Sequence, residues 1–328
     1  MLRAMSHILR SKRLEIRIRE PGEIYRASRF DWSTNVDSII LDGKHQFAST
    51  EILDSAKARV RGGGLHSEFG IRGALGYESA KIGERFGKIG VGFIRREDSD
   101  PYDFYRLYED IEPTPNKVRE INHDDGEELE ISGATALHQK FGWKLVRRYR
   151  VASHSLTVKT ELTNTGTEPI LTSEYCHNFL KLGEKNVGPD YALSFDFPLS
   201  EQFEDVNDKS RVLEALPGKT PRFIKEPAND PGSQFWVGSL LPAAPSLTEK
   251  MPIAELPQRT QWTLRDSETG LSASERLDGP CLRVDMWGRR YVCSVELFAR
   301  IDLRPGERQT WSRHYVFDDK HEPMSEVL

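Results

Sequence analysis

One histidine in the middle of the chain, His177, stands where it could transfer a proton. It lies in the run EYCHNF (residues 174–179), which follows an alternating apolar segment (156–162) and a turn at residues 164–166. An imidazole titrates near neutral pH and is therefore suited to general acid or base catalysis. The alternative is a core histidine whose ring nitrogens are satisfied by hydrogen bonds. The residue types alone leave both interpretations open.

A glutamate near the C-terminal end, Glu296, is the second candidate for proton transfer. It lies in the segment VELFARI (295–301), which precedes the turn sequence LRPGE (303–307). Successive side chains of a strand point to opposite faces, so Glu296 shares a face with Phe298, opposite Val295. A carboxylate beside an aromatic ring suits sugar binding. The alternative is a strand glutamate that faces solvent.

Polar groups near the N-terminus could bind a ligand. Arg29 and Asp31 could hydrogen-bond sugar hydroxyls or an anionic group, because an arginine fork binds a carboxylate or phosphate with two donors. Trp32 could stack on a sugar ring. In the alternative interpretation, Arg29 and Asp31 form a local ion pair and Trp32 belongs to the core.

Other chemical motifs are missing from the sequence. It contains no phosphate-binding loop, no HExxH, no GxSxG and no EF-hand loop. The nine histidines do not cluster with metal-ligand spacing. We therefore expect neither a cofactor nor a metal ion. An odd number of cysteines without CxxC spacing predicts no disulfide framework and favours a reducing compartment (Cys176, Cys281 and Cys293).

The elements that must position these residues are predicted to be strands. Apolar residues alternate with polar ones at residues 14–18, 156–162, 191–197 and 295–301. Turn sequences occur at residues 164–166, 278–280 and 305–306. Strands that follow one another without long helices pair antiparallel. The one helix-like stretch spans residues 50–60, and two segments are predicted to be loops (62–92 and 207–233).

Composition limits the class of protein. The 328 residues include 37% hydrophobic and 30% charged residues, enough to bury a core. A net charge of −5, with acidic and basic residues interleaved, argues against a nucleic-acid binder. No apolar run is long enough to span a membrane. We expect a cytoplasmic protein with one domain over residues 1–328, in which residues 1–13 could form a flexible extension.

Two segments resemble the aldose 1-epimerases, also known as galactose mutarotase-like proteins. Residues 156–182 resemble the stretch that leads, through a strand and an Asn-containing turn, to the family's histidine signature, here at His177. Residues 294–317 resemble the strand that carries the family's catalytic glutamate, here Glu296, before a Leu-x-Pro-Gly-Glu turn. The resemblance implies an all-β fold, a large antiparallel β-sandwich. It also implies that His177 protonates the ring oxygen of a sugar and that Glu296 acts as the base.

A third segment resembles the family less closely. In residues 61–93, a glycine run and the segment Glu68-Phe69-Gly70 resemble the glycine run and Phe-Gly pair of the hexose-phosphate branch, but Lys88 stands where a second histidine is expected. Lys88 either replaces that donor or is a surface lysine, and His66 is a further candidate. The resemblance thus adds His66, Glu68, Lys88 and Asn178 to the predicted sugar contacts.

The expected function is therefore the interconversion of sugar anomers. The implied ligand is a small carbohydrate, and it could carry a carboxylate or phosphate. Two alternatives remain on the same scaffold: a sugar lyase or hydrolase, and a carbohydrate-binding protein without activity, because fold alone does not determine chemistry.

Overall fold

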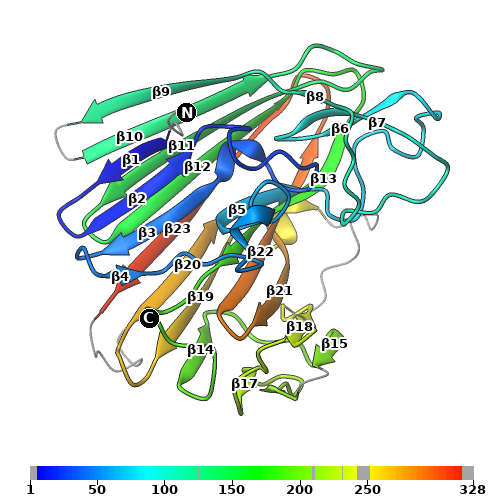
Figure 1. Cartoon of the computed structure of the whole chain (residues 1–328). Coiled ribbons are helices and arrows are strands. Elements are labelled where there is room, and N and C mark those ends of the chain that lie inside the picture. Colours follow the sequence, from blue (N-terminus) through cyan, green and yellow to red (C-terminus); the bar gives the residue numbers. More distant parts are fainter. Residues whose placement is uncertain (1–5, 124–125, 209–210, 231, 242–251, 320–328) are drawn as a thin grey trace.

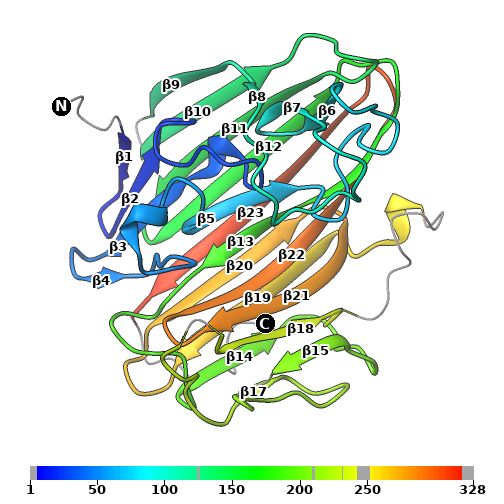
Figure 2. The ribbon, with the colours of Figure 1, turned by 45° about the vertical axis from the view of Figure 1, so that its right-hand side comes forward.

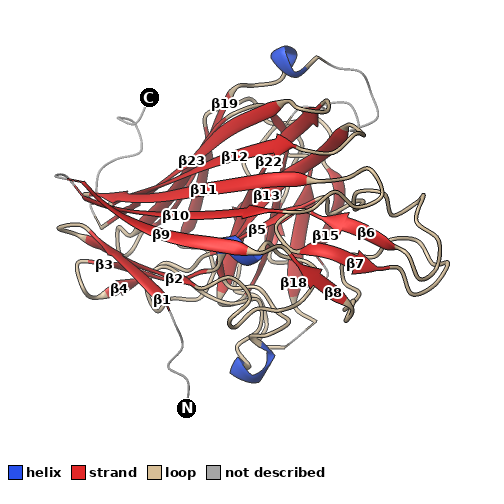
Figure 3. Cartoon of the chain, turned by 90° about the horizontal axis from the view of Figure 1, so that it is seen from above, coloured by secondary structure: helices blue, strands red, loops and turns tan. Residues whose placement is uncertain are grey.

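The computed structural model describes residues 6–123, 126–208, 211–230, 232–241 and 252–319. Within these residues, a ten-stranded and an eight-stranded sheet pack face to face (Figures 1 and 3). Every paired neighbour in the two sheets is antiparallel, as predicted from the succession of strands and turns. The predicted all-β sandwich is confirmed.

The ten-stranded sheet carries the candidate catalytic residues. In spatial order it contains β1 (Ser6–Arg10), β2 (Leu14–Arg19), β3 (Val36–Leu41), β5 (Gly64–Phe69), β13 (Ile170–Phe179), β22 (Val292–Leu303), β21 (Cys281–Arg289), β18 (Gln234–Gly238) and β15 (Glu204–Asp208). The short strand β4 (His45–Gln46) pairs with β3. The central strands β13 and β22 are far apart in sequence, so the sheet itself brings the middle of the chain beside its C-terminal part.

The eight-stranded sheet covers one face of the first sheet. Its order is β14 (Tyr191–Phe195), β19 (Arg259–Asp266), β20 (Ser272–Asp278), β23 (Arg308–Asp318), β12 (Ser155–Asn164), β11 (Trp143–Ala152), β10 (Gly126–Ala134) and β9 (Asn116–His123). Side chains from both sheets form one hydrophobic core, in which Trp143, Trp262 and Trp311 are fully buried. Such burial supplies most of the free energy that favours folding.

Two smaller sheets lie outside the sandwich. The first contains β6 (Arg85–Lys88), β7 (Gly92–Arg95) and β8 (Ile111–Pro113), and it lies near β5 in Figure 2. The second contains β16 (Leu213–Glu214) and β17 (Arg222–Phe223). The described helical segments are short 3₁₀ turns: η1 (Trp32–Thr34), η2 (Ser55–Lys57) and η3 (Ile253–Glu255).

The four alternating segments are confirmed as strands, although β14 ends at Phe195. Four other predictions need correction. The helix-like stretch 50–60 contains only the 3₁₀ turn η2. The segment 62–92 is not one loop, because it contains β5 and β6. The segment 207–233 contains β16 and β17. In the proposed N-terminal extension, Ser6–Arg10 form strand β1, whose side chains alternate poorly but whose backbone pairs with β2. No helix among the described residues is long and apolar enough to cross a membrane.

Candidate active site

A cavity of about 1070 Å³ opens on the face of the ten-stranded sheet that points away from the second sheet. Alternation along the strands creates it. On β22, Glu296 and Phe298 line the cavity, whereas Val295 and Leu297 belong to the core between the sheets. On β13, Ser173, Tyr175 and His177 line the cavity in the same way. The predicted division of β22 into two faces is therefore confirmed.

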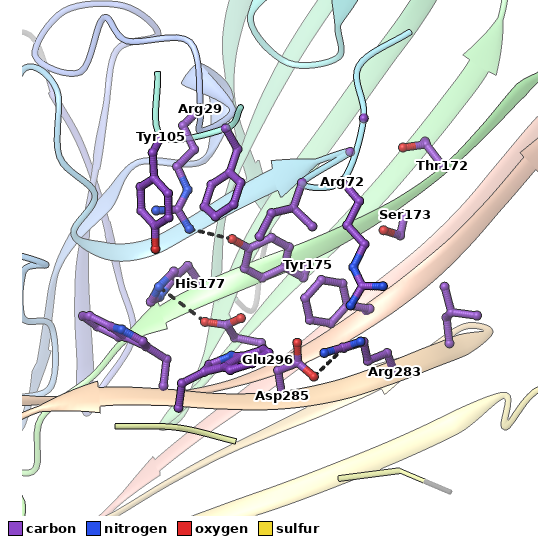
Figure 4. Close-up of a pocket in the computed structure, with 18 of the residues that line it drawn as sticks. Arg29, Arg72, Tyr105, Thr172, Ser173, Tyr175, His177, Arg283, Asp285 and Glu296 are labelled. Atoms are coloured by element: carbon purple, nitrogen blue, oxygen red, sulfur yellow. Dashed lines mark hydrogen bonds and ion pairs between the residues drawn. The ribbon is translucent and has the colours of Figure 1, made fainter. Parts of the chain in front are cut away.

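His177 and Glu296 meet in this cavity. The imidazole Nε2 lies 3.3 Å from the Oε1 atom of Glu296 (Figure 4). Both residues are buried, with side chains 5% and 6% exposed, yet both line the cavity. A ligand in the cavity can therefore reach an imidazole and a carboxyl group that already contact each other.

Burial controls the protonation of this pair. It raises the pKa of Glu296 to about 8, and the neighbouring carboxyl of Asp285, its partner on β21, acts in the same direction. Burial lowers the pKa of His177 well below the ordinary value, and the guanidinium of Arg29 lowers it further. Both directions favour a neutral pair at pH 7, in which Glu296 holds the proton.

Aromatic rings surround the pair. The ring of Phe179 stacks on His177 with centroids 3.8 Å apart, and Trp287 meets His177 edge-on at 5.0 Å. Tyr175 and Phe298 stack at 4.5 Å on the other side of Glu296. These contacts fix the orientation of the imidazole. They also give the cavity flat apolar walls of the kind that pack against sugar rings.

A buried ionic network lies beside the pair and holds Arg29. Glu68 accepts hydrogen bonds from Arg29 Nε at 2.9 Å, from the Tyr175 hydroxyl at 2.7 Å and from Lys88 Nζ at 3.0 Å. Lys88 also donates to the hydroxyl of Tyr102 at 2.8 Å. Arg29 and Tyr175 line the cavity, whereas Glu68 and Lys88 do not. The network therefore presents one guanidinium and one phenol to a ligand.

Comparison with known proteins relates this arrangement to one fold. No family model and no curated protein matches the sequence. Among solved structures, the chain is similar to the Slr1438 protein of Synechocystis sp. PCC 6803, with a TM-score of 0.58 and 14% identity over 97% of both chains. It is also similar to a galactose mutarotase-like protein of Clostridium acetobutylicum, with a TM-score of 0.57 and 12% identity over 97% of this chain and 96% of that one. A galactose 1-epimerase from Lactobacillus acidophilus gives a TM-score of 0.52 and 11% identity over 96% and 95% of the two chains. The chain has the galactose mutarotase-like fold.

Within this mutarotase-like fold, three of the eight predicted site residues line the cavity: His177, Glu296 and Arg29. Asp31 does not, because its carboxylate is fully buried and accepts two hydrogen bonds from Arg147. The alternative of a local pair between Arg29 and Asp31 is also wrong, since each residue has a different partner.

The other predicted sugar contacts lie behind the cavity wall. His66 is buried between Phe30 and Tyr25, and burial lowers its pKa to about 3. Asn178 points to the opposite face of β13, where it contacts Glu275. Glu68 accepts a hydrogen bond from Arg29, and Lys88 donates another to Glu68. Strand alternation or burial removes these four residues from direct contact with a ligand.

Several cavity residues were missed by the sequence interpretation. Asp285 contacts Arg283 at 2.6 Å, and its β-strand pairing with Glu296 could have been found only from the sheet order. Arg72 and Tyr105 lie in loops that carry no recognisable motif. Among the described residues, no three histidine, cysteine or acidic side chains are grouped as metal ligands would be.

Proposed function

We propose that this protein interconverts the anomers of an aldose by acid and base catalysis at His177 and Glu296. The observation that carries the proposal is their contact at 3.3 Å inside a cavity large enough for a sugar. The anomeric hydroxyl and the ring oxygen of an aldose are bonded to the same carbon. A carboxyl group and an imidazole that line the same cavity side by side can therefore reach both oxygens.

The reaction balances with a single proton on the pair. Because burial favours the neutral pair, that proton first passes from Glu296 to His177. The carboxylate of Glu296 then removes the proton of the anomeric hydroxyl while the imidazolium protonates the ring oxygen. The bond between the anomeric carbon and the ring oxygen breaks, and an open-chain aldehyde forms. Rotation about the next carbon–carbon bond and reversal of the proton transfers close the ring as the other anomer.

The residues that line the far side of the cavity favour a sugar that carries an anionic group. Arg72 is exposed, lines the cavity and points toward Asp285 and Arg283 in Figure 4. A guanidinium binds a carboxylate or phosphate with charge-assisted hydrogen bonds. We therefore include in the proposal that the aldose carries such a group. Arg29, the anion contact expected from the sequence, is engaged by Glu68 and Tyr175.

Proton NMR of freshly dissolved pure anomers tests the activity. We expect enzyme-dependent equilibration, and we expect His177→Asn and Glu296→Gln each to lower kcat by at least roughly 10²-fold. His154→Asn and Glu307→Gln, which change the same residue types outside the cavity, should leave the rate unchanged. Unsaturated products absorbing in the ultraviolet would instead indicate a lyase. Sugar binding without turnover would indicate a non-catalytic protein.

A comparison of neutral aldoses with sugar phosphates and uronates tests the anionic group. We expect Arg72→Ala to raise KM about tenfold for the anionic sugars, the loss of one charge-assisted hydrogen bond. Its effect on neutral aldoses should be small. Arg304→Ala, at an exposed turn, serves as the control. Equal KM changes for charged and neutral sugars would contradict this part of the proposal.

A further inference from the structure

The ladder between β13 and β22 opens at the candidate active site. Residues Ile170–Glu174 pair with Ala299–Leu303, and the pairing then stops. It resumes with two backbone hydrogen bonds between Leu180 and Cys293, in unchanged register. All of these residues belong to the described part of the chain. Between the two paired stretches, five residues of each strand face each other without a ladder.

The opening places the candidate catalytic residues opposite each other. In the register of the flanking pairs, the position across from His177 is Glu296. Both side chains point to the cavity face, at the centre of the opened stretch. A continuous ladder would satisfy the backbone groups here. Where the ladder is open, the backbone N–H and C=O groups need other hydrogen-bond partners, because buried backbone groups are almost always hydrogen-bonded.

Side chains replace the missing ladder bonds. Arg313, on β23 of the second sheet, donates through Nη2 to the backbone oxygens of Leu297 at 2.9 Å and Glu174 at 3.2 Å. The amide nitrogen of the Asn178 side chain donates to the backbone oxygen of Val295 at 2.6 Å. These groups come from the core side. They hold β13 and β22 at a fixed separation beneath the cavity.

Ser294 completes the replacement on the cavity side. Its hydroxyl accepts a hydrogen bond from the backbone N–H of Asn178 at 3.0 Å. The same hydroxyl donates to Oε1 of Glu296 at 3.1 Å. This is the carboxyl oxygen that contacts Nε2 of His177. Ser294 is fully buried, so water does not compete for its single proton.

We infer that Ser294 is the positioning residue of Glu296: the opened ladder directs a backbone N–H onto its hydroxyl, and the hydroxyl in turn orients the carboxyl group toward His177. The inference rests on the proposed function for its catalytic meaning. Its geometric content, a hydroxyl that controls one carboxyl oxygen, does not depend on any sugar. In the proposed reaction, this hydrogen bond is stronger when Glu296 is ionised, because bonds to charged acceptors are stronger.

Three variants test the inference: Ser294→Ala removes the hydroxyl, Ser294→Thr keeps it, and Ser272→Ala removes a hydroxyl from a buried strand position on β20. The first measurement needs no substrate. The ¹³C resonance of the Glu296 carboxyl, assigned by its loss in Glu296→Gln, is titrated in each variant. Asp285, Glu68, Arg29 and His177 also act on this carboxyl and are unchanged in all three variants.

We expect the Glu296 pKa to rise in Ser294→Ala, because the hydroxyl stabilises the ionised form, and to stay near the wild-type value in the two other variants. For a sugar that the wild type equilibrates, kcat should fall about tenfold in Ser294→Ala with KM unchanged, as for a hydrogen bond to a charged group. The basic limb of the pH profile should move in the same direction as the pKa.

The outcomes separate the two proposals. If Ser294→Ala leaves both the titration of Glu296 and kcat unchanged, the inference is wrong while the proposed function stands. If the titration shifts as expected but no sugar is equilibrated by the wild type, the hydrogen bond is real and the proposed function fails. If Ser294→Thr behaves like Ser294→Ala, packing rather than the hydroxyl is responsible, and the inference is overturned.

Discussion

At the residue scale, Lys88 shows how environment determines what a charged side chain does. The sequence places it at a motif position and leaves open whether it contacts a sugar or solvent. The structure shows neither, since it is 1% exposed and its ammonium group bonds Glu68 and Tyr102. A buried carboxyl group without partners would be costly, so the hydrogen bond from Lys88 helps Glu68 to lie in the interior, where it holds Arg29.

Replacement of Lys88 should therefore lower the free energy of unfolding, because this side chain acts within the protein and does not line the cavity. We expect Lys88→Met to lower the free energy of unfolding by about 3 kcal/mol, because it removes one partner of a buried pair. Lys140→Met breaks a pair of similar length with Glu168, but that lysine is 67% exposed, so its loss should lower the free energy of unfolding far less. Urea denaturation measures both. Equal losses in the free energy of unfolding would show that the burial of Lys88 does not determine how much it contributes to stability.

At the element scale, the position of β5 depends on one backbone conformation. Gly64 begins β5 with a φ of +61°, and a Cβ atom there would overlap the backbone oxygen of Val36 on β3. This close approach seats β5 between β3 and β13. On its other side, β5 places His66 opposite His177. A glycine at the start of the strand thus controls how the wall behind the site is assembled.

Gly64→Ala should consequently be far more disruptive than an alanine at another left-handed glycine. Gly43 has a φ of +70° and open space around it, so Gly43→Ala should cost only the conformational penalty of about 1–2 kcal/mol. Gly64→Ala adds the clash with Val36 and should lower Tm by several times as much. Thermal unfolding followed by circular dichroism compares the two. Similar Tm values for both variants would contradict the close-approach argument.

The same element explains what the sequence could and could not predict. Strands with one buried face, such as β2 and β12, alternate clearly and were predicted. Strand β5 is buried along its whole length, so it shows no alternation, and its two glycine-flanked ends resemble a loop. His177 and Glu296 were found because each lies in a motif. Asp285 was not found because only the order of strands in the sheet brings it beside Glu296. Arg72 lies in a loop without a motif, and Ser294 is an ordinary serine whose role depends on its contacts with Asn178 and Glu296.

At the scale of the whole molecule, charge is buried throughout the interior between the two sheets. Arg147 bonds Asp31, and Arg313 bonds both Glu174 and Glu275. All five residues are at most 1% exposed. Ionic groups in such a place contribute little net stability but strongly penalise arrangements that leave one of them unpaired. This layer also supplies the guanidinium that bridges β13 and β22, so the core and the site share one network.

Buried titratable groups also make the stability of the molecule depend on pH, with opposite signs. The pKa of His66 is lowered to about 3, so the unfolded chain binds more protons than the folded one between pH 3 and 6.5, and stability rises over that window. The pKa of Glu296 is raised to about 8 from 4.5, so the folded chain binds more protons between pH 4.5 and 8. Its contribution to stability therefore falls as pH rises through that window.

The difference between wild type and Glu296→Gln isolates the second effect. Glutamine cannot ionise, so the variant should gain stability relative to the wild type from pH 4.5 to 8, with a slope that approaches about 1.4 kcal/mol per pH unit, and the difference should become constant above pH 8. Urea denaturation at closely spaced pH values gives both curves. The histidines distant from Glu296 contribute equally to both proteins, so their effect cancels in the difference. Parallel curves would mean that Glu296 has the same pKa in the folded and unfolded chain. The proposal that Glu296 holds a proton beside His177 at pH 7 would then be wrong.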